Sequence, residues 1–151
     1  MSYQVPKLSI DVKLVLSDGS KLEGMVFVSE NMLSYTGTPR FEDFLNRNEE
    51  RFFPFTTQNE GVVLINKGRL IYLHSSEEDS DILRERLMLK PKQVQLRFSN
   101  GDEIEGVVYS NLPQDTARVS DFFNQKEKFL PLYLAEGKVI VNTDMVVSIK
   151  D

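Results

Sequence analysis

The stretch Val12-Lys13-Leu14-Val15-Leu16-Ser17-Asp18-Gly19 returns later in the chain as Val94-Gln95-Leu96-Arg97-Phe98-Ser99-Asn100-Gly101. In both stretches apolar residues occupy every second position, which is typical of a strand with one buried face. The Asp-Gly and Asn-Gly pairs then predict a tight hairpin of type I′, a turn in which both central residues have positive φ. A second strand follows, and Gly24 or Gly106 within it predicts a bulge or a sharp bend.

The similarity between the two stretches extends along the chain in the same order. The offset between matching blocks falls from 82 residues at Val12 and Val94 to 76 at Gly61 and Gly137, and it changes only between blocks. Loop deletions would produce this pattern. The later matching blocks are Thr38–Asn46 with Thr116–Asn124, Phe52–Phe55 with Phe129–Leu132, and Gly61–Ile71 with Gly137–Val147. The chain is therefore a tandem duplication of one module.

The middle block of each copy changes from strand to helix periodicity. Phe41, Phe44 and Leu45 fall at i, i+3 and i+4, as on one face of a short helix, and the second copy repeats the pattern. The expected N-caps are Thr38 and Thr116, and the expected left-handed C-terminal caps are Asn46 and Asn124. Further strands are predicted near 52–56, 62–66 and 70–74, and near 129–134, 138–142 and 146–150. We therefore expect a mainly β protein of two tandem copies, each a five-stranded antiparallel sheet or small barrel with one short helix between strands two and three.

The composition divides the chain into two repeats and a linker. The first barrel repeat is predicted over 1–74 and the second over 90–151. Between them, residues 75–89 begin with Ser-Ser-Glu-Glu-Asp-Ser-Asp, which predicts a solvated acidic linker. The alternatives are an acidic docking strip or a calcium loop, although the ordered ligand spacing of a calcium loop is missing. The rest of that segment is predicted to be a helical turn or a lead-in strand.

Two resemblances follow from these motifs. A strand, a turn with Gly, a strand opening with Gly and a closing strand pair, such as Val63–Ile71, resemble the Sm-like small β-barrel. This resemblance implies the barrel fold and raises RNA or oligonucleotide binding as a possible function. The block Arg-x-x-Asp-Phe-Leu/Phe-Asn, followed by Phe-Phe/Leu-Pro-Phe/Leu, resembles a group of uncharacterised bacterial proteins, a resemblance that implies no mechanism.

The residue inventory narrows the function classes. The chain has no cysteine and a single histidine, so disulfides, thiolate metal sites and multi-histidine sites are excluded within one chain. No cofactor or catalytic motif is found, and we expect no enzyme activity and no cofactor. No stretch approaches 18 apolar residues, so we expect a cytoplasmic protein without a membrane partner.

The charge is uneven between the two halves of the chain. The formal net charge is −5, with 8 basic and 13 acidic residues in 1–81 and 10 of each in 82–151. An acidic chain is disfavoured as a nucleic-acid binder. What the repeats share specifies the fold, so we expect function in their differences or at the seam between them.

The polar residues best matched between the copies are the candidate binding residues. They are Arg40, Asp43 and Asn46 in the first copy and Arg118, Asp121 and Asn124 in the second. An Arg and an Asp three apart can pair on one helix face, which makes a structural role the first interpretation. The functional interpretation is a notch for a peptide or small anion.

The function expected first is a non-enzymatic interaction or scaffold module. It would bind protein partners, or further copies of itself, through sheet edges or the helix face, because an open sheet leaves edge strands that are covered or paired. The alternative is Sm-like RNA or oligonucleotide binding.

Overall fold

The computed structural model describes residues 7–29, 40–47, 49–76, 90–110 and 118–151, and within these ranges the chain is mainly β. The first repeat contains β1 (Lys7–Leu16), β2 (Lys21–Ser29), α1 (Phe41–Arg47), β3 (Phe52–Thr57), β4 (Gly61–Asn66), the 3₁₀ turn η2 (Lys67–Arg69) and β5 (Leu70–Ser75). The second contains β6 (Lys90–Phe98), β7 (Glu103–Ser110), α3 (Val119–Phe123), β8 (Phe129–Leu134), β9 (Gly137–Asn142), the 3₁₀ turn η3 (Thr143–Met145) and β10 (Val146–Lys150). The repeat predicted from sequence is thus matched element for element.

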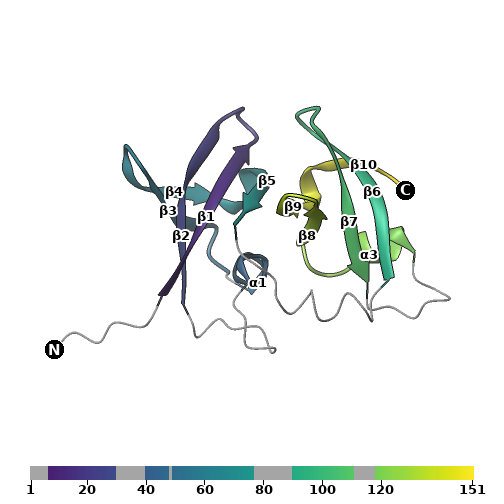
Figure 1. The fold of residues 1–151 in the computed structure, drawn as a ribbon. Helices are drawn as coiled ribbons and strands as arrows, with labels where there is room; N and C mark the ends of the chain where they lie inside the picture. Colours follow the sequence, from purple (N-terminus) through teal and green to yellow (C-terminus); the bar gives the residue numbers. More distant parts are fainter. Residues whose placement is uncertain (1–6, 30–39, 48, 77–89, 111–117) are drawn as a thin grey trace.

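The ten strands of the described residues belong to one antiparallel sheet in the order β10-β6-β7-β8-β9-β5-β1-β2-β3-β4. Within each repeat the order is the same: the fifth strand, then the first to the fourth. The prediction of two separate barrels is not supported, because the sheet is not closed and the repeats share it. Strand β5 pairs with β9 of the other repeat instead of with β4 of its own, which satisfies the backbone groups of both strands. Figure 1 shows β5 and β9 meeting between the repeats, with the β3–β4 hairpin and β10 at opposite sides.

The two predicted hairpins form, but their turn type differs from the prediction. Gly19 and Gly101 both have φ of 90°, whereas no non-glycine residue in the described ranges has positive φ, which excludes type I′. The Gly19 N–H donates to the Leu16 carbonyl at 3.0 Å, and the Leu16 N–H donates to the Ser20 carbonyl at 2.9 Å. This is a three-residue loop in which a type I turn ends in a left-handed glycine.

The strand glycines Gly24 and Gly106 lie in unbroken register, so no bulge forms at either. Their physical role is a close approach between strands. A Cβ on Gly24 would collide with the backbone oxygen of Thr56 on β3. A Cβ on Gly106 would lie 2.7 Å from Leu132 Cγ on β8 and 2.9 Å from the Tyr133 carbonyl oxygen. Glycine is thus needed where the third strand of each repeat crosses the second.

The helix caps also differ from the prediction. Helix α3 begins after Arg118, which occupies the N-cap position without a side-chain cap bond, and Thr38 and Thr116 lie outside the described residues. Asn46 is inside α1, and Asn124 has φ of −96°, so neither is a left-handed cap. The side chain of Asn46 is instead used at the seam, as described below.

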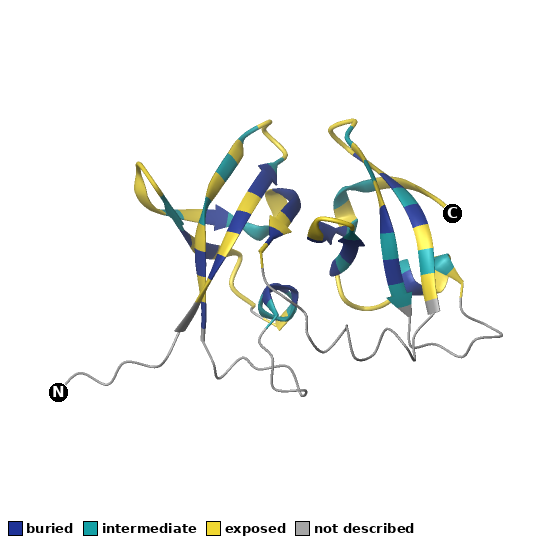
Figure 2. Cartoon of the chain, in the orientation of Figure 1, coloured by how far each residue is buried: buried dark blue, intermediate teal, exposed yellow. Residues whose placement is uncertain are grey.

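In the part of the chain that the structure describes, two hydrophobic clusters form the core, and each includes residues from both repeats. The cluster under α1 includes Phe129 and Ile140 of the second repeat. The cluster of the second repeat includes Val15, Ile71 and Tyr72 of the first. Buried residues accordingly follow the strands of both repeats up to the β5–β9 seam in Figure 2. The repeats are packed together by shared apolar burial as well as by strand pairing.

The predicted linker lies mostly outside the described residues, which end at Ser76 and resume at Lys90. Its two first residues are described, and Ser75 ends β5 while the Ser76 N–H donates to the Asp11 carbonyl at 3.0 Å. None of the helices in the described ranges is long and apolar enough to cross a membrane.

Candidate functional site

The seam between the repeats is a regular antiparallel strand pair. Its register places Tyr72, Leu73, His74 and Ser75 of β5 opposite Val141, Ile140, Val139 and Lys138 of β9. Leu73 and Ile140 are each 1% exposed. This seam shows how one copy of the module binds another, and it serves as the reference for the open ends of the sheet.

A buried ion pair joins α1 to β9 across the seam. The Nζ of Lys138 donates to Oε1 of Glu42 at 2.8 Å, and both side chains are almost completely buried. The matching residues of the other repeat are Val62 for Lys138 and Ser120 for Glu42. The ion pair is therefore specific to this seam.

Asparagine side chains complete the seam. Asn46 Nδ2 donates to the Phe129 carbonyl at 2.8 Å, and the Phe129 N–H donates to Asn46 Oδ1 at 2.9 Å. Asn142 Nδ2 donates to the Leu70 carbonyl at 2.9 Å in a buried position. Each asparagine binds backbone groups, so both fix the position of one repeat on the other without depending on the partner's side chain.

Over the described ranges the sheet ends at β4 and β10, and these two edge strands expose the counterparts of buried seam residues. Leu64 of β4 is 64% exposed, whereas its counterpart Ile140 is 1% exposed. Val147 of β10 is 64% exposed, whereas its counterpart Ile71 is fully buried. In the same way, Ile149 is 36% exposed and its counterpart Leu73 is 1% exposed. Phe52 is 47% exposed, whereas its counterpart Phe129 is 7% exposed. The same apolar positions are thus covered at the seam and open at the two ends.

A groove of about 720 Å³ lies beside the β10 edge. Its walls come mainly from α3 and β10 and include Val119, Phe123, Asn124, Val147 and Ile149, with Lys92 of β6 and Thr143 of η3 also lining it. In the first repeat, the matching surface of α1 and β5 is covered by β8 and β9, since α1 contacts β8 and β5 pairs with β9. Among the residues that the structure describes, no strand fills this groove, which is thus the counterpart of a surface that the seam covers.

The β4 edge has a smaller hollow of about 410 Å³. Phe52, Leu64, Ile65, Asn66 and Arg69 line it, together with residues of the β1–β2 hairpin. The open ends of the sheet thus differ in shape: one is a strand beside a helix groove, and the other is a hairpin with projecting apolar side chains.

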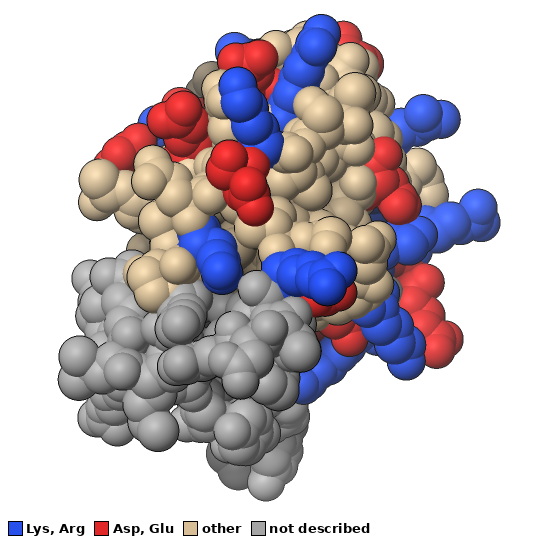
Figure 3. Space-filling view, turned by 90° about the vertical axis from the view of Figure 1, so that its right-hand side faces the viewer, with Lys and Arg blue, Asp and Glu red and all other residues tan. Residues whose placement is uncertain are grey.

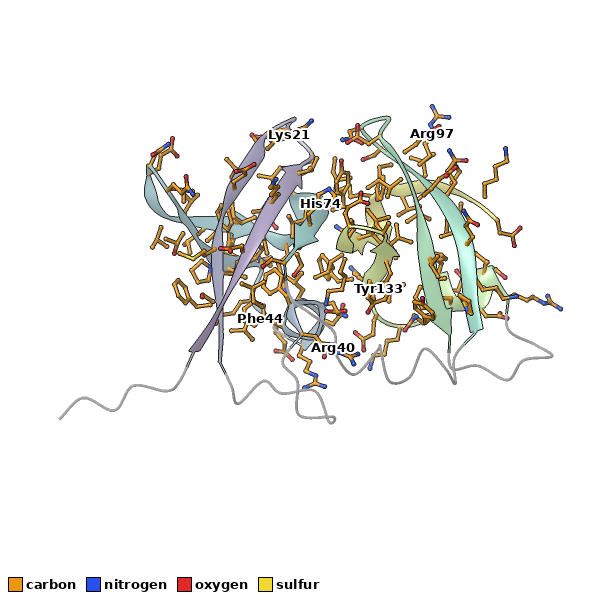
Figure 4. All side chains as sticks on the ribbon, viewed as in Figure 1. Lys21, Arg40, Phe44, His74, Arg97 and Tyr133 are labelled. Atoms are coloured by element: carbon orange, nitrogen blue, oxygen red, sulfur yellow. The ribbon has the colours of Figure 1, made fainter. Side chains whose placement is uncertain are left out.

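The helix-block residues predicted from sequence do not form one site. The Arg40 carbonyl accepts the N–H groups of Asp43 and Phe44 at the start of α1, and Arg40 is half-buried. Arg118 plays the same backbone role for α3 but is exposed and lines the β10 groove, as Asn124 also does. Asp121 is exposed and Asp43 is half-buried. Figure 4 shows Arg40 beside α1 at the lower end of the seam.

His74 and Tyr72 of β5 lie at the seam with their rings 5.8 Å apart in an edge-to-face arrangement. Burial, and then the nearby Lys13, lower the pKa of His74, while Glu136 opposes this shift. Tyr72 donates to Asp102 Oδ2 at 2.7 Å, from β5 to the hairpin of the second repeat. Burial and this hydrogen bond raise the pKa of Tyr72 to about 12. Tyr72 therefore stays a neutral donor that joins the repeats.

A further hollow of about 430 Å³ lies at the seam and is lined by both repeats. Lys67 Nζ donates to the Leu45 carbonyl at 3.1 Å, and the exposed Lys128 and Asp144 form an ion pair of 3.2 Å. Both cationic and carboxylate side chains line this hollow. Over the part of the chain that the structure describes, no three His, Cys, Asp or Glu side chains are grouped so that they could hold a metal ion.

Sequence reasoning missed the Glu42–Lys138 pair because it compared the residues that the copies share. The available signal was a difference: one lysine within the apolar strand Gly137–Asn142, where the first copy has a valine. That difference lies at the seam, one of the places where the sequence analysis expects function.

Comparison with family models, with curated proteins and with solved structures finds no match to this chain. The resemblances to Sm-like barrels and to the bacterial group therefore stay predictions, and the interpretation of the site depends on its own geometry.

Proposed function

We propose that this chain is a non-enzymatic interaction module that binds an extended strand of a protein along its open sheet edges. The observation that supports this function is the exposure of apolar side chains on β4 and β10, at positions that are buried wherever the edge is paired. Strand addition of this kind obtains affinity from backbone hydrogen bonds and specificity from the pockets that take alternate side chains.

Strand β4 lacks the charged residues and the proline that usually protect a free strand, whereas β10 carries Lys150 and a register irregularity between Val146 and Ser148. Strand β4 presents Val62 and Leu64 to solvent, and both are about two-thirds exposed. Free edges are usually protected by charged residues, by proline or by a cover. In β4 the sequence Gly-Val-Val-Leu-Ile-Asn carries neither charge nor proline. An uncharged, apolar edge strand of this kind is suited to pairing with a partner strand rather than to exposure to solvent.

The geometry supports RNA or oligonucleotide binding less well. Phosphate binding needs clustered Lys and Arg side chains. On the face shown in Figure 3, which includes the end with β6 and β10, basic and acidic side chains alternate around an uncharged area. With a net charge of −5, this alternation favours a protein partner.

A peptide of residues 60–67 tests the proposed function directly. We expect it to bind the full chain and to shift the amide resonances of β10 and α3, because it supplies the strand that the groove lacks. The matched control is the same peptide with every second backbone nitrogen methylated, which keeps the side chains but prevents strand pairing. Equal shifts with both peptides, or shifts with neither, contradict strand addition; retention of the chain on immobilised RNA that added salt abolishes would favour the alternative.

A further inference from the structure

We infer that the partner strand comes from a second copy of this chain, with β10 of one molecule pairing antiparallel with β4 of the next. This inference rests on the proposed edge-binding function and names its partner. The seam inside the chain is the template, because β4 is the counterpart of β9 and β10 is the counterpart of β5.

The template fixes the register of the intermolecular pair. Inside the chain Leu73 lies opposite Ile140, and the repeat places Ile149 and Leu64 at these positions. In the same way Ser148 faces Ile65, and Lys150 faces Val63. The exposed apolar residues of the two ends therefore meet each other in this register, and a slip by one residue would turn them to opposite faces.

Helix α3 provides the second half of the contact. Asn46 of α1 binds both backbone groups of Phe129 across the seam, and the counterparts are Asn124 and Phe52. Asn124 lines the open groove, and Phe52 is 47% exposed at the other end of the molecule. Docking of the β3–β4 hairpin into the α3–β10 groove would bury Phe52 and give Asn124 the backbone partners that Asn46 already has.

The ion pair at the seam distinguishes the contact between β5 and β9 inside the chain from the proposed contact between β10 and β4 of two molecules. Lys138 is buried against Glu42, whereas the external contact brings Val62 against Ser120. Strand β9 would bury Lys138 beside α3 without Glu42, and β4 beside α1 would bury Glu42 without Lys138. Burying a charge without its partner is costly, so each strand fits only its own position.

The two binding surfaces differ and lie at opposite ends of the sheet, so their contact is head to tail. Such a contact repeats from molecule to molecule and produces a closed ring or an open filament. Pairing of β4 with β4, or of β10 with β10, would leave the α3 groove without its hairpin. The sheet geometry therefore favours growth through unlike ends.

Sedimentation velocity of the full chain tests this inference with one blocking variant for each end. We expect the parent protein to form species at multiples of 17.4 kDa as its concentration rises. Leu64→Lys and Ile149→Lys should each remain monomeric, because each variant would bury a lysine at the joint. A mixture of the two should form a one-to-one dimer and nothing larger, since each variant retains one working end.

Phe27→Lys is the matched control, because Phe27 is an exposed apolar residue of β2 away from both edges. It should assemble as the parent does, and unfolding curves should show that all three variants fold. A parent protein that stays monomeric at every concentration overturns the inference, and so does Ile149→Lys that self-associates like the parent. If the chain stays monomeric while the 60–67 peptide binds, edge binding stands and the partner is another protein; if neither associates, both proposals fail.

Discussion

Lys138 and Glu42, on different repeats, form an ion pair of 2.8 Å in which both side chains are almost completely buried. Two charges in such a place are stable only together, so the pair specifies which strand occupies the seam. The counterpart positions, Val62 and Ser120, carry no charge. The contact between the two repeats thus contains a buried ion pair, whereas the corresponding positions at the two open ends of the sheet carry no charge.

Changing the seam residues one at a time should destabilise the chain, and changing both should restore much of the loss. Glu42→Ser and Lys138→Val install the residues of the opposite repeat. We expect each single change to lower the free energy of unfolding by about 3–5 kcal/mol, because it removes the opposite charge that a buried charge contacts across the seam. The double variant should lose clearly less than either single variant, as measured by urea unfolding. Additive losses would mean that the two charges do not interact.

The strand glycines should tolerate no side chain. We expect Gly24→Val to lower the free energy of unfolding by about 3 kcal/mol or more, the upper end of overpacking effects, because its Cβ would collide with the Thr56 backbone. Gly106→Val should act similarly against β8. Gly68→Ala is the control, since its Cβ would meet only the Asn66 side chain, at 3.4 Å. Thermal unfolding of the valine variants at the parent's temperature would contradict the close strand crossing.

Stability should fall as the pH drops through the ordinary range of histidine. The folded chain lowers the pKa of His74 below 6.5, so the unfolded chain takes up the proton first. The stabilisation by neutral His74 is complete above that value and is lost as the pH falls. Urea midpoints should decrease between about pH 7.5 and about pH 5.5 in the parent and change less in His74→Gln. Asp18 and Asp102, whose pKa values are also lowered, titrate at still lower pH. An equal decrease in both proteins would exclude His74 as the cause.

The two matching asparagines should separate folding from assembly. Asn46→Ala removes two hydrogen bonds to Phe129, and we expect it to destabilise the chain by about 1–3 kcal/mol. Asn124→Ala should change the stability of the monomer by less than about 0.5 kcal/mol, because the side chain is at the surface. It should nevertheless weaken self-association in sedimentation experiments. Self-association of Asn124→Ala at the same concentrations as the parent would contradict the proposed contact between Asn124 and the β3–β4 hairpin.

Sequence periodicity was sufficient to predict the elements of each repeat but not how the repeats join. Alternation in 12–16 and the i, i+3, i+4 spacing at Phe41 are local signals, and the strands and helices appear where they indicate. Pairing of β5 with β9 is a long-range choice between edges of similar composition, which no local pattern encodes. The turn type was also missed, because Asp-Gly is compatible with a three-residue loop in which only the glycine has positive φ.

The candidate site shows the same limit. Arg40 and Arg118 were selected because they match, yet matching residues mainly specify the fold. The seam depends on Glu42 and Lys138, which do not match between the copies. The open edges could be recognised only when exposed Leu64 was compared with its buried counterpart Ile140.

Disulfide cross-linking between Leu64→Cys and Ile149→Cys tests the head-to-tail contact most directly, because the chain has no other cysteine. Directly opposed residues of antiparallel strands lie within the Cα separation that a disulfide needs. Under mild oxidation the double variant should give a ladder of covalent multimers on a non-reducing gel. The pair Leu64→Cys with Ser148→Cys, shifted by one residue, should give far less. The absence of a ladder, or equal cross-linking by Leu64→Cys alone, would contradict the pairing of β10 with β4.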